Sequence, residues 1–109
     1  MKLWFENSHG VERIINEQVN TWQEVNQAIT AFINQCNVNK INAAKARYNE
    51  NFDKSKVNLF KRYYTRAWKQ ADGRVRIDVG SHTEFFIWEG FLNDCCDNTN
   101  TADTNGNMV

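Results

Sequence analysis

The sequence predicts an α+β fold in which one main helix packs on one face of an antiparallel sheet of about five strands. Three observations lead to this prediction: a helical spacing of apolar residues over 22–36, strand-like alternation on both sides of that segment, and turn residues between the alternating runs. The expected order is β-β-α-β-β-β, with a basic excursion between the helix and the third strand. With 109 residues, the chain is long enough for one hydrophobic core.

The first two strands are expected to form a hairpin. Residues 2–6 alternate around Trp4, and turn-forming residues follow over 7–10. The second strand, from Val11 to about Val19, alternates only weakly. It is therefore predicted to lie at an edge of the sheet or to have a partly solvated face.

The helix is the most strongly indicated element. Thr21 and Glu24 fit a capping box, in which each side chain accepts a hydrogen bond from a backbone N–H at the helix start. The apolar residues that follow share one helical face: Trp22, Val25, Ile29, Phe32, Ile33 and Cys36. This face is expected to cover the sheet.

Three further strands are predicted after the excursion. The first, 59–69, is aromatic and basic, and its alternate residues are expected to share one face: Phe60, Arg62, Tyr64, Arg66 and Trp68. Asp72-Gly73 predicts a type I′ hairpin that leads into the strand 74–79. The last strand, 83–89, is apolar on both faces, which favours a central position in the sheet.

The excursion, 38–58, is polar and basic and contains neither Gly nor Pro, so it is able to form a second, weakly amphipathic helix. A connection between a helix and a strand usually needs only a few residues, which makes this segment a predicted functional insertion. Residues 1–92 are expected to form a single domain around it. The polar residues 93–109 bury too little apolar surface to order themselves and are predicted to be a flexible tail.

The net charge of the chain is zero, but the middle of the sequence is strongly cationic. Between Lys40 and Arg76 there are eleven basic and three acidic residues, a net +8. Such segregation steers a protein toward anionic partners. We expect cations and aromatic rings to converge on one exposed side. The candidate partner-binding residues are Lys40, Lys45, Arg47, Lys54, Lys56, Arg62, Tyr64, Arg66, Trp68, Arg74 and Arg76.

Three interpretations of these residues stay open. Arginine, tyrosine and tryptophan are enriched at protein interfaces. The same mixture of guanidinium groups and flat rings suits the backbone and bases of nucleic acid. The third interpretation is structural, with the aromatic residues packed beneath the helix and the arginines on a solvated outer face.

Catalysis is the weaker hypothesis. Asp78, His82 and Glu84 could form a metal or general-base site, but their spacing matches no metal motif. A hydrogen-bonded turn over 81–83 is favoured instead. No motif for a cofactor is present, and none is predicted.

A cytoplasmic protein is expected, because no apolar run approaches the roughly 20 residues of a membrane span and Glu6 interrupts any signal-like start. The three cysteines are then predicted to be reduced thiols, with Cys36 in the core and Cys95 and Cys96 near the C-terminus. A disulfide between Cys36 and one of the other two remains the alternative.

Several motifs resemble small uncharacterised proteins encoded by phages and prophages of Gram-positive bacteria. They are KLWFENSHGVER at 2–13, YYTRAW at 63–68 and IDVGSHTEFF at 77–86. The similarity covers 1–36 and 60–90. In the proteins that this chain resembles, the helix runs almost directly into the Tyr-Tyr strand, so 38–58 look like an insertion.

The resemblance implies an accessory protein of a mobile element. Small non-enzymatic phage proteins of this kind often inhibit host defence by occupying an effector, and anti-CRISPR proteins are the best-known example. On this basis we expect a binding protein that blocks a host nuclease, such as a CRISPR–Cas effector, with a host protein or ribonucleoprotein as its partner. Direct nucleic-acid binding and a small enzyme centred on His82 are the alternatives, and the sequence does not indicate the oligomeric state.

Overall fold

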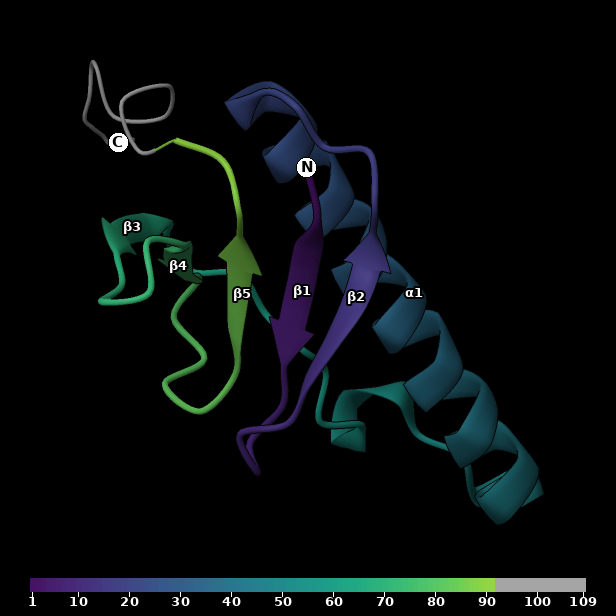
Figure 1. Cartoon of the computed structure of the whole chain (residues 1–109). Coiled ribbons are helices and arrows are strands. Elements are labelled where there is room, and N and C mark those ends of the chain that lie inside the picture. Colours follow the sequence, from purple (N-terminus) through teal and green to yellow (C-terminus); the bar gives the residue numbers. More distant parts are fainter. Residues whose placement is uncertain (92–109) are drawn as a thin grey trace.

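One main helix lies against a five-stranded antiparallel sheet, as the sequence predicts, in a computed structural model that describes residues 1–91. The elements in chain order are β1 (Leu3–Glu6), β2 (Glu12–Asn16), α1 (Trp22–Tyr48), β3 (Arg66–Lys69), β4 (Val75–Asp78) and β5 (Phe85–Trp88). Two short 3₁₀ turns, η1 (Asn49–Asn51) and η2 (Lys54–Lys56), follow α1. The strand order in the sheet is β2-β1-β5-β4-β3, and Figure 1 shows β5, β1 and β2 side by side in front of α1.

The N-terminal hairpin forms at the predicted turn. The Asn7 side chain accepts hydrogen bonds from the N–H groups of His9 and Val11, at 2.9 and 3.0 Å. Gly10 has a φ of +79°, a conformation that glycine adopts without steric cost. β2 is an edge strand with mostly exposed residues, which confirms the expectation drawn from its weak alternation.

β5 is the central strand, as its apolar faces predict. It pairs with β1 on one side and with β4 on the other, so that Ile87 lies between Trp4 and Arg76. Phe86 and Trp88 are fully buried in the core under α1, and Ile87 is fully buried as well. The face of β5 that points away from α1 is covered by side chains of the strands on both sides of it. An edge strand has such a neighbour on one side only, so an apolar outer face favours the central position.

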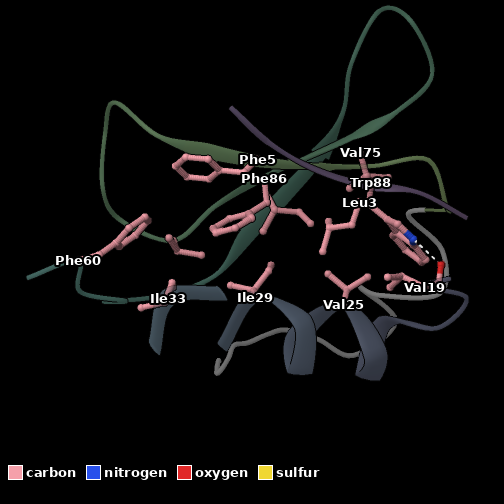
Figure 2. Packing of buried hydrophobic residues seen from close by; sticks show 12 residues of the cluster. Leu3, Phe5, Val19, Val25, Ile29, Ile33, Phe60, Val75, Phe86 and Trp88 are labelled. Carbon is pink, nitrogen blue, oxygen red and sulfur yellow. Dashed lines mark hydrogen bonds between the residues drawn. The ribbon is translucent and has the colours of Figure 1, made fainter. Parts of the chain in front are cut away.

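α1 begins at the predicted capping box. Thr21 Oγ1 accepts from the Glu24 N–H, and Glu24 Oε1 accepts from the Thr21 N–H, both at 3.1 Å. One turn later, buried residues of α1 project into the core that Figure 2 shows: Val25, Ile29 and Ile33. At one end of this core the Trp88 indole N–H donates to the Val19 carbonyl at 2.9 Å, so the ring is buried without an unsatisfied donor.

The helix and the third strand have boundaries that the sequence did not predict. α1 does not end near Cys36 but continues to Tyr48, so the first half of the predicted insertion is an extension of the helix. Only Arg66–Lys69 pair with β4. Before that pairing, the N–H groups of Tyr63 and Tyr64 both face the Val79 carbonyl, at 2.9 and 3.5 Å, which sets two residues opposite one as in a β-bulge.

The turn between β3 and β4 is not the predicted type I′ turn. A type I′ turn needs positive φ at both Asp72 and Gly73, whereas only Gly73 has one, at +92°. Its N–H donates to the Gln70 carbonyl at 3.0 Å, and the Asp72 side chain accepts from the Arg74 N–H. The hairpin itself is therefore confirmed with a different turn. The tail predicted at 93–109 lies outside the described residues.

Candidate binding surfaces

Residues 38–58, here called the basic arm, extend beyond the end of the sheet. α1 has 27 residues and is therefore about 40 Å long, whereas strands of four or five residues span only about 15 Å. The last fully or nearly buried residue of α1 is Ile33, and no residue of the arm belongs to the buried core. Figure 1 shows the C-terminal half of α1 projecting past the strands.

Side-chain contacts hold the returning chain of the arm against α1. The Asn37 amide donates to the Phe60 carbonyl at 2.9 Å and accepts from the Phe60 N–H at 2.7 Å, which closes the base of the arm. Lys40 Nζ donates to the Asn58 carbonyl at 3.1 Å. Further out, Lys45 Nζ lies 5.8 Å from the centroid of the Phe52 ring. The arm is thus an ordered hairpin of helix and returning chain, and not the independent second helix that the sequence allowed.

The basic arm carries the first five candidate residues as exposed cations. Lys40, Lys45, Arg47, Lys54 and Lys56 are all exposed. Within residues 1–91, none of them forms an ion pair with a carboxylate of the chain. Asp53 of the arm accepts hydrogen bonds from the hydroxyl and the N–H of Ser55, and these bonds lower the pKa of its carboxyl group. Five cations against Glu50 and Asp53 leave the arm with a net +3.

Two of the predicted contact residues, Arg74 and Arg76, are instead paired with carboxylates on the sheet face opposite α1. Arg74 lies 2.9 Å from Glu12 and 2.8 Å from Asp72, and these hydrogen bonds raise its pKa. Its guanidinium also lies 4.8 Å from the centroid of the Trp4 ring. This arginine therefore joins β4 to the far edge of the sheet.

Arg76 makes an equivalent contact one row further along β4. Its Nη2 lies 2.7 Å from Glu6 Oε1, and its guanidinium lies 4.7 Å from the centroid of the Phe85 ring. Glu6 Oε1 is buried and accepts no hydrogen bond, so this contact is a charge pair of imperfect geometry. Arg74 and Arg76 are therefore not free cations, because Glu12 and Asp72 pair with Arg74 and Glu6 pairs with Arg76. Their role as partner contacts stays a prediction.

Arg62, a third predicted contact residue, is hydrogen-bonded to α1. Its guanidinium donates to Asn26 and Thr30 of α1 and to Thr65, and burial lowers its pKa. The predicted alternation put Arg62 on one face with Tyr64 and Phe60. The actual chain is irregular over 60–65, so Phe60 enters the core and Arg62 turns to the helix.

The remaining candidates lie along and just before β3, where they form an aromatic strip of Tyr63, Tyr64, Arg66 and Trp68. The three rings are 69%, 39% and 39% exposed, and the Arg66 side chain is 68% exposed. Tyr63 was not predicted, because strict alternation places it on the face opposite to Tyr64. The bulge opposite Val79 removes that alternation, and a bulge leaves no clear signal in the sequence.

The turn around His82 offers little support for a catalytic site. The Ser81 hydroxyl donates to Glu84 Oε1 at 2.8 Å and accepts from the Glu84 N–H at 3.2 Å, which is the hydrogen-bonded turn favoured by the sequence. His82 is exposed, with a φ of +70°. In the part of the chain that the structure describes, no three His, Cys, Asp or Glu side chains lie close enough to hold a metal ion.

Cys36 is a free, partly buried thiol, and burial raises its pKa. The prediction that Cys36 lies in the core is not confirmed, because the residue is only partly buried and is not part of the core cluster. Cys95 and Cys96 lie outside the described residues, so the disulfide alternative stays a hypothesis. Among the described residues, no helix is both long and apolar enough to span a membrane. Comparison of the chain with protein-family models, with curated proteins and with solved structures finds no match.

Proposed function

We propose that this chain is a non-catalytic binding protein that grips an acidic surface of a larger partner with its basic arm. The observation that carries the proposal is the contrast between two sets of cations. Arg62, Arg74 and Arg76 are engaged within the molecule, whereas the five arm cations are exposed and unpaired within residues 1–91. Lys40 and Lys45 also make contacts within the arm, but no carboxylate of residues 1–91 neutralises any of the five charges, so all five are available to the anionic groups of a partner.

The geometry of the arm suits such a role. A helical scaffold closed at its base by Asn37 presents its charges before binding, so that little conformational entropy is lost when a partner arrives. Exposed charges of one sign accelerate encounter with an oppositely charged surface. The exposed Tyr48 ring, next to Arg47, adds apolar contact area of the kind found at interface hot spots.

We further propose that the partner is a host-defence nuclease, such as a CRISPR–Cas effector, which the chain blocks by steric occupation. This finer proposal rests on the resemblance to phage and prophage proteins. The partner is then a host protein or ribonucleoprotein, and the protein acts in the cytoplasm of the host cell. An arm that projects past the domain reaches a recessed acidic surface while the sheet and helix cover its entrance.

Cleavage assays with a panel of purified CRISPR–Cas effectors test this function. The arm-neutral variant carries Lys45→Gln, Lys54→Gln and Lys56→Gln. The charge-matched control carries Gln18→Glu, Gln23→Glu and Gln27→Glu, which are exposed positions outside the arm with the same total charge change. The wild-type chain should inhibit at least one effector. The arm-neutral variant should need about tenfold or more protein for half-inhibition, because each lost contact weakens binding, whereas the control should match the wild type.

Two results would contradict the proposal. Failure of the wild-type chain to slow cleavage by any effector would remove the nuclease as the partner. Equal inhibition by the wild-type chain and the arm-neutral variant would remove the arm as the binding surface. The thermal midpoints of all three proteins are measured alongside and should agree within a few degrees, because exposed charges contribute little to stability.

A further inference from the structure

The aromatic strip combines exposed flat rings with cations. Tyr63, Tyr64 and Trp68 keep between two fifths and two thirds of their surface exposed although aromatic rings normally seek burial. No acidic residue occurs from 54 to 71. Lys61, Arg66 and Lys69 are exposed within this stretch. Such a surface lies at the β3 edge of the sheet.

Contacts beneath the strip hold two of its rings in place. A Cβ atom built on Gly80 would lie 3.0 Å from Tyr63 Cβ and 3.3 Å from the Tyr64 ring, so both tyrosines pack directly on the glycine backbone. The Tyr64 hydroxyl donates to Asp78 at 3.3 Å, and the Arg66 guanidinium lies 5.4 Å from the centroid of the Tyr64 ring. The rings are exposed but pre-positioned.

We propose that the aromatic strip is a binding site for single-stranded nucleic acid. Bases stack on Tyr63, Tyr64 and Trp68, while Lys61 and Arg66 contact the phosphates. Rings and cations in alternation are the combination that single-stranded chains require, since each nucleotide offers a flat base and one negative charge. The nearest carboxylates have partners within the molecule, because Asp72 pairs with Arg74 and Asp78 accepts from Tyr64. Asp78 also lies 3.4 Å from Arg66, whose side chain is still 68% exposed and can reach a phosphate.

Other anionic partners use this surface less completely. An acidic peptide pairs with Lys61 and Arg66 but leaves the ring faces without flat partners. A nucleic-acid duplex offers phosphates, but its base faces are stacked inside the helix and cannot reach the tyrosines. The inference concerns residues outside the basic arm, so it goes beyond the proposed function and does not depend on it.

Fluorescence anisotropy with labelled oligothymidylate and oligouridylate of about 12 nucleotides tests the site. The oligonucleotides are added at low salt to the full chain in the arm-neutral background, which removes three of the arm's cations. Tyr63→Ala and Trp68→Leu should each weaken binding about tenfold, the size of one lost stacking contact. Trp68→Phe keeps a ring and should stay near the affinity of the unchanged strip. Val11→Ala, an exposed apolar position next to β2 at the opposite edge of the sheet, serves as the control and should change nothing.

Salt dependence provides a second readout. Two phosphate contacts on a single strand predict a slope of about −1.4 for the logarithm of the binding constant against the logarithm of salt concentration. The proposal is overturned by absence of binding at low salt or by equal loss in Trp68→Phe and Trp68→Leu. Equal affinity for a duplex of the same length, or displacement of the oligonucleotide by polyglutamate at matched charge, would also overturn it. Because the arm-neutral variant keeps the strip, failure here and failure of the arm in the cleavage assay are separate results.

Discussion

Arginine has three different roles in this molecule, and its surroundings decide which role applies. Arg62 is hydrogen-bonded to α1, Arg74 bridges two carboxylates on the open sheet face, and Arg66 remains largely exposed over Tyr64. The guanidinium group can serve in each place because its planar set of five donors suits side-chain oxygens, carboxylates and aromatic faces alike. Charge alone therefore does not identify a contact residue.

Arg62 is predicted to stabilise the fold and not to contact a partner. Arg62→Ala removes the hydrogen bonds that the guanidinium donates to Asn26, Thr30 and Thr65. We expect the free energy of unfolding to fall by about 2 kcal/mol. Lys61→Ala, at the exposed neighbouring position, should change it by less than about 0.5 kcal/mol. Urea denaturation of both variants measures the difference. Equal, small losses in the two variants would show that the guanidinium contacts add nothing.

At the scale of residues, the sequence predicted correctly an interaction between residues that lie close together in the chain. Thr21 and Glu24 are three positions apart, so their capping box depends on no distant part of the chain. The pairs of Arg74 with Glu12 and of Arg76 with Glu6 join residues that only the sheet brings near, unlike the local pair of Arg74 with Asp72. No spacing rule within one strand could have indicated these pairs.

At the scale of elements, the basic arm is the part of the fold that the sequence described least well. The apolar pattern of α1 fades after Cys36, which predicts the end of the helix there. The helix instead continues through a stretch rich in alanine, lysine and arginine, which are strong helix formers and need no buried face. Loss of amphipathic pattern marks where a helix leaves the core, not where it ends.

The arm should be dispensable for folding. Replacing residues 41–56 with a Gly/Ser linker of about four residues preserves Asn37, Phe60 and the hydrogen bonds between them. We expect cooperative unfolding to persist, with the free energy of unfolding within about 2 kcal/mol of the wild-type value, because no residue of the arm is buried. Chemical denaturation and amide NMR spectra of the shortened chain measure this. A chain that fails to fold would make the arm part of the core structure.

For the molecule as a whole, the fold class and the central strand were predictable because burial leaves a strong mark on sequence. β5 is apolar on both faces, and β2 alternates weakly, so their central and edge positions follow from composition. The distribution of charge was less predictable. The cationic middle of the sequence divides in space into free cations on the arm, partly free cations at the strip, and arginines neutralised on the sheet.

Arrangement, and not total charge, should therefore control binding to anionic surfaces. The wild-type chain has a net charge of zero, and both the arm-neutral variant and the charge-matched control have −3. Elution from immobilised heparin, a polyanion without any particular sequence, compares them directly. We predict that the wild-type chain and the control are retained and elute at similar salt concentrations, whereas the arm-neutral variant elutes at much lower salt. Co-elution of the two −3 variants would contradict the claim that the arm's free cations form the binding surface.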